Sequence, residues 1–425
     1  MCAEEKGNDR RGVFGWAFLL ISLIFYYYLQ VYLPLQGLHS NDFKHLYLGA
    51  KLLREGHNPY DAERVLYEAG RLGFPSVLPY VYPPFTGLVL EPLTFLSFRV
   101  AVHTWFWFNQ AFFLGALLLT LRSIYGKLSP RDVTLWIFYS AIFFPLTRNF
   151  TAGQLNVVLL FCFALVWHFH EEGRAWAVGV VSAFAALFKL SPIILLLYFF
   201  WKRQWRNGLW SVIFYLLFLM IAVLFTGWDV HKAFLPIVGQ MSYGHSTWEE
   251  LGHDFYRDPF NQSFNSFFHH VMTDNPYTKP WVRATPATAN VITMFVSLIL
   301  VAVVMFATYP REGRRRGPLM EKRDYALFIM LSLFLPSLCW DHYLVQALWA
   351  IILLSYITWR TGAFRCSVFA LVAAIILAIR FNFAGDALSH GTGILFMSLK
   401  LWGALTIFLL LIFSGRIKPE KERHV

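Results

Sequence analysis

Long apolar runs separated by short polar segments make up most of the sequence. Twelve of these runs lie at residues 13–33, 99–121, 132–147, 154–170, 174–189, 191–201, 207–226, 287–308, 324–339, 343–359, 366–381 and 393–414. Many are close to the roughly 20 residues that a helix needs to cross a bilayer. The pattern predicts an all-α polytopic membrane protein with about 12 transmembrane helices. No internal repeat or low-complexity linker divides the chain, so we expect residues 1–425 to form a single integral membrane domain.

A thirteenth apolar segment, 82–97, differs from the others. It is short, contains Pro83, Pro84 and Pro92, and carries a glutamate. Two consecutive prolines prevent a regular helix before Pro84 and favour an extended conformation at Tyr82. The segment either crosses the membrane or folds back as a re-entrant or surface-lying helix. The positions of the basic residues decide between these alternatives.

Lys and Arg total 36 against 25 Asp and Glu, which gives a formal net charge of +11. The basic residues gather in segments 122–131, 202–206, 309–323, 360–365 and 415–425. Cytoplasmic loops of membrane proteins carry an excess of Lys and Arg. All of these segments face the cytoplasm only if the thirteenth segment does not cross, so we predict that it folds back. Both termini are then cytoplasmic. Because topology accounts for the charge, we predict no nucleic-acid partner.

The outer side of this topology receives a first loop at 34–98 and a second loop at 227–286. The outer loops hold most of the Asp, His, Asn and Gln residues. We therefore expect the chemistry on the extracytoplasmic side of the plasma (inner) membrane. The histidines of the second loop form no pair at clean ligand spacing, so no metal site is predicted. The four cysteines likewise suggest no disulfide and no CxxC metal site.

The first outer loop is expected to form juxtamembrane helices. Residues 43–55 have amphipathic helical spacing, and Asp42 or Asn41 is placed to cap that helix. Asp61 follows an Asn-Pro-Tyr turn and is expected to cap a further helix, Ala62–Arg71. A helix lying flat on the membrane would hold Asp42 at the depth of lipid head groups. Asp42 is then a candidate catalytic base, although a solvated loop position would explain the same carboxylate.

Other polar residues interrupt the apolar runs near the outer face. Arg148 ends one predicted span, and Gln154 and Asn156 begin the next, with a turn at 148–153. Polar side chains at membrane depth are costly and usually face a cavity. Lys189 has no local carboxylate partner and either snorkels to the surface or binds an anion.

The tight connection Trp340-Asp341-His342-Tyr343 lies between two apolar runs. Its side chains should line the outer mouth of the bundle. Asp341 either orients the ring of His342 or caps the hairpin, and the sequence does not decide between these roles.

Six short motifs, taken in order, resemble a known class of enzymes. They are Gly-x-Asn-Pro-Tyr at 56–60, Tyr-x-Tyr-Pro-Pro-Phe at 80–85, Gly-Gln-x-Asn at 153–156, Lys-x-x-Pro at 189–192, Asn-Gln-Ser at 261–263 and Ser-x-x-Trp-Asp-His-Tyr at 337–343. With an aspartate at the start of the first outer loop, the chain resembles the GT-C class of polytopic glycosyltransferases. More narrowly, it resembles glycosyltransferase family 87, which includes polyprenol-phosphate-mannose-dependent mannosyltransferases. The last two predicted spans carry no matching motif.

The resemblance implies a GT-C-like fold and a function. Family members take a sugar from a lipid monophosphate on the outer face and invert the anomeric centre. Their catalytic base corresponds to Asp42, and the residues near the donor phosphate correspond to Lys189 and His342. Gln262 would lie near the sugar or the acceptor. We add Arg148 to the phosphate group from its position alone.

The remaining polar candidates are assigned to sugar or acceptor binding: Tyr82, Gln154, Asn156, Asn261, Gln262 and Asp341. The candidate residues match the needs of a glycosyl transfer. The phosphate of the donor is already a good leaving group, so its displacement needs one base and nearby cations. We expect no cofactor, because a single phosphate can be neutralised by protein cations without metal. The expected partners are a polyprenyl-phosphate sugar donor, a lipid or glycan acceptor and membrane lipids.

The sequence therefore predicts a hexosyltransferase, with mannose as the expected hexose. A transporter or a flippase for lipid-linked sugars is the alternative. That alternative would explain Lys189, Lys400, Arg380 and Glu91 as parts of a translocation path. It predicts polar residues spread through the spans towards both faces, whereas most polar residues here are expected on the outside.

Overall fold

The computed structural model describes residues 2–38, 42–310 and 317–415, with side chains from Phe14 onward. The described residues form helices and loops without a strand. The first half contains α1 Cys2–Tyr26, a π-helical segment Tyr27–Tyr32, α2 Leu33–Gly37, α3 Phe43–Arg54, α4 Ala62–Arg71, α5 Pro84–Leu90, η3 Glu91–Phe95, α6 Phe98–Tyr125, α7 Pro130–Ile142, α8 Phe144–Ala152, α9 Asn156–Glu171, α10 Ala175–Phe188, η4 Ser191–Ile193 and α11 Ile194–Trp201.

The second half contains α12 Trp205–Thr226, α13 Trp228–Gln240, η5 Glu249–Leu251, α14 Phe264–Met272, α15 Pro286–Thr308, α16 Pro318–Phe334, η6 Asp341–Ala347, α17 Leu348–Thr361, α18 Phe364–Ala378, η7 Asp386–Leu388, α19 Gly393–Met397 and α20 Leu399–Ser414. Parts of two predicted basic segments, 311–316 and 416–425, lie outside the described residues.

Five helical segments among the described residues are long and apolar enough to cross a membrane: Phe14–Gly37, Phe98–Tyr125, Trp205–Thr226, Pro286–Thr308 and Asp341–Thr361. The bent pair α8 and α9 makes a sixth if it is one broken span. The protein is thus an all-helical, multi-pass membrane protein, as predicted. Each of the twelve predicted runs overlaps a helix, but several of these helices are shorter than a full crossing. The number twelve stays a prediction.

One predicted boundary is wrong at Arg148. The sequence placed this residue at the end of a span and a turn at 148–153. In the structure α7 ends at Ile142, and a separate helix, α8, carries Arg148 in its middle. Pro145 explains the break, because a proline cannot continue the hydrogen bonding of a preceding helix. A bend of 117° then separates α8 from α9, so α8 lies across the direction of α9.

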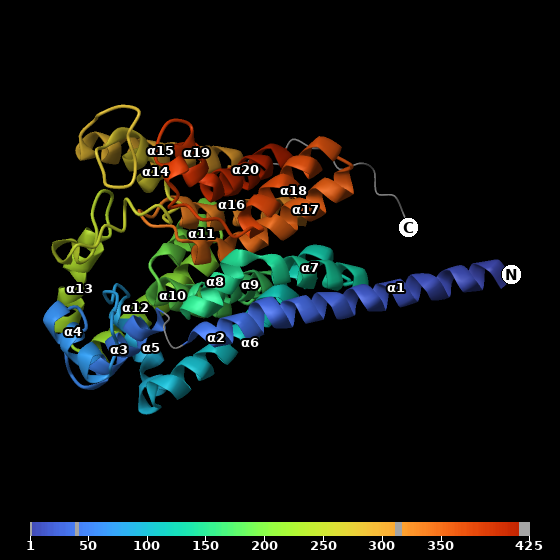
Figure 1. Ribbon diagram of the computed structural model, residues 1–425. Coiled ribbons are helices and arrows are strands. Elements are labelled where there is room, and N and C mark those ends of the chain that lie inside the picture. The colour runs from blue at the N-terminus through green and yellow to red at the C-terminus, as the bar shows by residue number, and fades with distance from the viewer. Residues whose placement is uncertain (1, 39–41, 311–316, 416–425) are drawn as a thin grey trace.

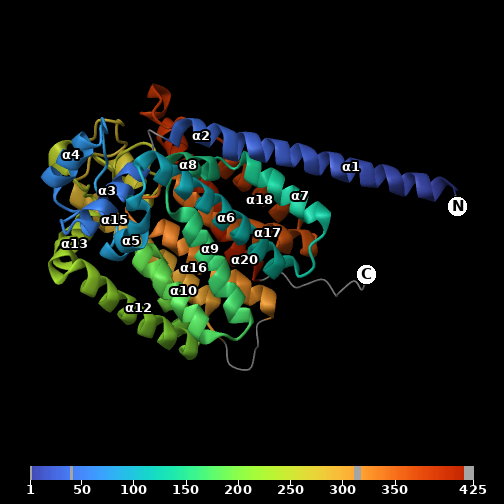
Figure 2. The same cartoon turned by 90° about the horizontal axis from the view of Figure 1, so that it is seen from below.

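Helices α3, α4, α5 and α13 gather at one end of the molecule, while the start of α1 and the start of α7 lie at the other (Figures 1 and 2). The predicted helix Ala62–Arg71 is confirmed, and Asp61 caps it by accepting from the backbone nitrogen of Arg64 at 3.2 Å. The predicted cap at Asp42 is wrong. Asp42 precedes α3 directly, but its side chain accepts no capping hydrogen bond. Asn41, the alternative cap, lies outside the described residues.

The segment 82–97 forms two short helices, α5 and η3, which follow a stretch without helix or strand that ends in a bend at Tyr82. With seven residues, α5 is about 10 Å long, a third of the hydrocarbon thickness. The stretch before it packs closely on α3, since a Cβ at Gly49 would overlap the ring of Tyr80. The hydroxyl of Thr86 donates to the carbonyl of Phe188 at 2.8 Å. Thus α5 is anchored to the end of α10, immediately before Lys189.

Candidate active site

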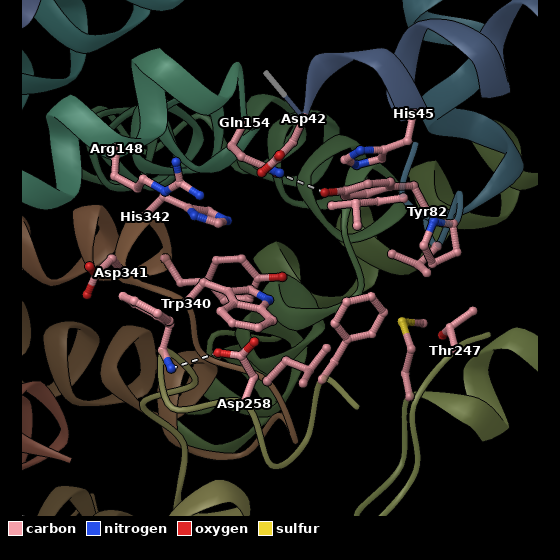
Figure 3. A pocket seen from close by; sticks show the side chains of 18 of the residues that line it. Asp42, His45, Tyr82, Arg148, Gln154, Thr247, Asp258, Trp340, Asp341 and His342 are labelled. Carbon is pink, nitrogen blue, oxygen red and sulfur yellow. Dashed lines mark hydrogen bonds between the residues drawn. The ribbon is translucent and has the colours of Figure 1, made fainter. Parts of the chain in front are cut away.

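A cavity of about 730 Å³ opens among segments that are far apart in the sequence. Its wall is mixed, with aromatic side chains between a small number of charged and polar ones, as in most sites for small molecules. The polar lining side chains are Asp42, His45, Tyr82, Arg148, Gln154, Thr247, Asp258, Trp340, Asp341, His342, Tyr343, Arg380 and Asn382 (Figure 3). Both outer loops predicted from the sequence therefore contribute to one cavity.

Asp42 enters this cavity from the position before α3. The expected helix cap is not formed. The carboxylate of Asp42 also accepts no other hydrogen bond from the described residues. Figure 3 shows Asp42 close to Gln154 and His45, at the edge opposite Asp258. His45 follows Asp42 by three residues, which is one helical turn. Burial lowers the pKa of His45 to about 4, although the charge of Asp42 acts in the opposite direction. His45 is therefore a neutral neighbour of this carboxylate.

Tyr82 and Gln154 join two distant segments beside Asp42. The hydroxyl of Tyr82 donates to Oε1 of Gln154 at 2.9 Å. The ring of Tyr82 stacks on His45 with centroids 5.8 Å apart and an angle of 9° between the planes. The hydroxyl of Tyr60 donates to the Tyr82 carbonyl at 2.7 Å, which fixes the chain at this point. The non-helical stretch before α5, rather than α5 itself, thus forms part of the cavity wall.

Arg148 brings positive charge to the same cavity. Its side chain is exposed, and it makes no hydrogen bond or ion pair within the part of the chain that the structure describes. His342 lies beside it and is buried, with Nδ1 lacking a partner among the described residues (Figure 3). An unpaired guanidinium and an imidazole at one wall are suited to an anion such as a phosphate monoester or diester.

Asp341 is already paired with a lysine. Its Oδ1 lies 3.1 Å from Nζ of Lys400, whose side chain is fully buried. The alignment of the two atoms is not that of a hydrogen bond, so charge holds the pair together. Of the two roles left open by the sequence, neither orientation of the His342 ring by Asp341 nor a hairpin cap is seen. Asp341 instead connects the His342 segment to α20.

Lys189 and Asn156 lie behind the cavity wall. The ammonium of Lys189 donates to Oδ1 of Asn156 at 3.0 Å and lies 3.3 Å from the ring centroid of Tyr343. Tyr343 presents its ring to the cavity, whereas neither Lys189 nor Asn156 lines it. Asn156 also accepts from Nε2 of Gln346 at 3.2 Å. Both residues therefore support the segment that carries His342, and Lys189 can act on a ligand only through its field or after Tyr343 moves.

Asn261 and Gln262 do not line the cavity either. Oδ1 of Asn261 accepts from the backbone nitrogen of Cys339 at 2.9 Å, and its Nδ2 donates to the carbonyl of Ser337 at 3.1 Å. Nε2 of Gln262 donates to the carbonyl of Met397 at 2.9 Å. The Asn-Gln-Ser motif therefore ties the predicted second outer loop to the segment before Trp340 and to α19.

Seven polar residues of the cavity were not assigned as site residues from the sequence: His45, Thr247, Asp258, Trp340, Tyr343, Arg380 and Asn382. The spacing of His45 from Asp42 was a usable signal, and Trp340 was noted only as part of a motif. Asp258 lies in a loop whose conformation no periodic pattern reveals, and Arg380 lies beyond the last motif. No three His, Cys, Asp or Glu side chains gather as a possible metal site within the described ranges. Independence of metal stays a prediction.

The pattern of glycosyltransferase family 87 matches residues 80–337, more than half of the sequence. The chain belongs to glycosyltransferase family 87. The matched region contains Tyr82, Arg148 and Lys189, but it begins after Asp42 and ends before Trp340. The resemblance expected from the motifs is therefore confirmed at the level of the family.

Three relatives are similar to the chain. A polyprenol-phosphate-mannose-dependent alpha-(1-2)-phosphatidylinositol pentamannoside mannosyltransferase of Mycobacterium tuberculosis is 24% identical over 63% of the chain and 56% of its own length. A protein of the same description from Mycolicibacterium smegmatis is 28% identical over 49% of each. A polyprenol-phosphate-mannose-dependent alpha-(1-2)-phosphatidylinositol mannoside mannosyltransferase of Mycobacterium tuberculosis is 21% identical over 76% of each. The chain matches about half the length of the first two relatives. No solved structure matches the chain.

Proposed function

We propose that this family 87 glycosyltransferase transfers mannose from a polyprenyl phosphate to a lipid-linked glycan, with inversion, on the extracytoplasmic side of the inner membrane. One observation carries the proposal: the carboxylate of Asp42 and the guanidinium of Arg148, neither paired within the described chain, face the same cavity. The relatives described as polyprenol-phosphate-mannose-dependent mannosyltransferases supply the sugar and the carrier. Their phosphatidylinositol mannoside acceptors suggest the class of acceptor.

The proposed chemistry divides the cavity between a base and a cationic wall. Asp42 takes the proton from the acceptor hydroxyl, because its oxygens have no other partner among the described residues. Arg148 and His342 bind the donor phosphate and stabilise the charge that collects on it as the sugar leaves. Lys189 adds a positive field from behind the Tyr343 ring. A metal ion is not needed in this scheme, since protein cations are placed to neutralise one phosphate.

The proposed side of the membrane follows from charge and position. The basic connection between α6 and α7 lies at the end of the molecule away from α3, α4 and α5 (Figures 1 and 2). Cytoplasmic loops are enriched in Lys and Arg. The end that carries Asp42 then faces outward, and α3 and α4 become juxtamembrane helices there. Membership of a transferase family supports transfer over the alternative of a transporter or flippase.

The test is Asp42→Asn in proteoliposomes that contain polyprenyl-phosphate mannose and a mannoside acceptor. Loss of a general base lowers a rate by roughly 10²- to 10⁴-fold, so transfer should fall at least about a hundredfold. Asp61→Asn is the matched control, because asparagine also caps a helix and α4 is kept. Unchanged transfer in Asp42→Asn would refute the role of Asp42 as the base.

A further inference from the structure

The wall of the cavity opposite Asp42 is formed by Asp258 and Trp340 (Figure 3). Neither residue has a role in the chemistry described above. Asp258 belongs to the second outer loop, and Trp340 directly precedes η6. A carboxylate and an indole ring are therefore both available to bind a ligand at this wall.

Only one carboxylate oxygen of Asp258 accepts a hydrogen bond within the described chain. Its Oδ1 accepts from the backbone nitrogen of Phe260 at 2.8 Å, which closes a tight turn. Its Oδ2 has no hydrogen-bond partner in the described chain. The neighbouring Arg257 pairs with Asp254 at 2.9 Å and does not neutralise it. Burial raises the pKa of Asp258, whereas a hydroxyl that donates to its carboxylate would favour the charged form.

Trp340 is held firmly beside this carboxylate. Phe255 meets its ring edge-on, with centroids 6.3 Å apart. The backbone just before it is fixed as well, because the backbone nitrogen of Cys339 donates to Oδ1 of Asn261 at 2.9 Å. The ring is half-buried and borders the cavity. A rigid ring of this kind offers large apolar contact at a low cost in conformational entropy.

Sugars present both chemical surfaces that this pair would recognise. The C–H groups on one side of a hexopyranose pack on an aromatic ring, and its hydroxyls donate to carboxylates. The donor phosphate does not fit here, because the negative charge of Asp258 would repel it. That phosphate fits the wall of Arg148 and His342.

We propose that Asp258 and Trp340 form the acceptor-sugar subsite, which binds a terminal hexopyranosyl residue of the acceptor glycan. The free oxygen of Asp258 accepts a hydroxyl of this sugar, and the indole of Trp340 supports its apolar face. The sugar is thereby held with another hydroxyl towards Asp42 across the cavity. This subsite rests on the proposed transfer from a polyprenyl phosphate to a glycan.

The test measures the KM of acceptor and donor separately for Asp258→Asn, with an alkyl α-mannoside as the acceptor probe. An asparagine oxygen still accepts from Phe260, so the turn is kept and only the charge is lost. A hydrogen bond to a charged group is lost, which predicts a rise in the acceptor KM of about 10- to 100-fold. The KM for polyprenyl-phosphate mannose should stay within about twofold. Asp274→Asn, in the same loop but exposed and outside the cavity, is the control and should leave both constants unchanged.

Trp340→Leu provides a second, independent measurement. It removes the ring and keeps an apolar side chain, so it too should raise the acceptor KM more than the donor KM. An unchanged acceptor KM in Asp258→Asn, or an equal rise in both constants, would overturn the subsite. Failure of the unmodified protein to transfer mannose to any mannoside probe would instead overturn the proposed function. The two failures are therefore distinguishable.

Discussion

Lys400 and Asp341 form a buried ion pair, and removing one partner should destabilise the fold more than removing the other. The side chain of Lys400 is 0% exposed and that of Asp341 is 9% exposed, with 3.1 Å between their charged atoms. Asp341 borders the cavity, whereas Lys400 is enclosed. Water can reach the carboxylate when its partner is removed, but it cannot reach the ammonium. Loss of Asp341 should therefore destabilise the fold more than loss of Lys400.

The magnitude follows from the cost of leaving one buried charge without its partner, which is about 3–5 kcal/mol. We expect Lys400→Met near the lower end of this range and Asp341→Asn near the upper end. At roughly 2 °C per kcal/mol for a large chain, the apparent melting temperature should fall by about 6–10 °C. The double variant buries no net charge at this position, so it should be more stable than Asp341→Asn alone.

The assay is thermal unfolding of the purified protein in detergent, followed for the four members of the double-mutant cycle. Lys232→Met is the control, because Lys232 forms an ion pair of similar length, 2.7 Å, with an exposed partner, Asp229. That variant should melt like the unmodified protein. Additive effects of the two single changes would refute the argument, since independent residues share no interaction energy. Equal melting of Lys400→Met and the unmodified protein would do so as well.

Two further predictions concern the packing around Asp42. The folded pKa of His45 is about 4, below its unfolded value near 6.5, so the folded protein binds fewer protons between these values. The stability that neutral His45 contributes is present above pH 6.5 and is lost towards pH 4, by up to about 3 kcal/mol. In His45→Phe the melting temperature should therefore depend less on pH across this range. Gly49→Ala should cost about 1–3 kcal/mol by overlap with the Tyr80 ring, whereas Gly70→Ala, in open space on α4, should melt no lower than the unmodified protein. A normal melting temperature for Gly49→Ala would contradict the close packing of α3 on the stretch before α5.

The hydrophobic pattern predicted most of the helices but not where they break. The helix Ala62–Arg71 and its Asp61 cap were predictable because an amphipathic period and a capping residue are local signals. The separate helix α8 was not, because the apolar run continues through Phe143 and Phe144 and only Pro145 interrupts it. A run of apolar residues gives the length of a segment, whereas the 117° bend depends on packing against distant elements.

The site was predictable where a polar residue interrupts an apolar run. Arg148 and His342 lie at the ends of such runs, whereas Asp42 was predicted from its place in the first outer loop, and the structure brings all three to one cavity. The rule does not distinguish residues that face the cavity from residues that support its wall. Lys189 satisfies it equally well, yet the ring of Tyr343 separates it from the cavity. Only the three-dimensional arrangement separates the two groups.

The shared cavity also bears on the segment 82–97, independently of the charge bias. Asp42 precedes this segment and Arg148 follows it, yet both side chains line the same cavity. An even number of crossings must then lie between them. If α6 and α7 each cross, as the sequence predicts, the segment 82–97 cannot add a third crossing. Its helix α5 has only seven residues and lies beside α3 at the same end of the molecule (Figure 1). Charge bias and the position of the site therefore favour the same topology from unrelated observations.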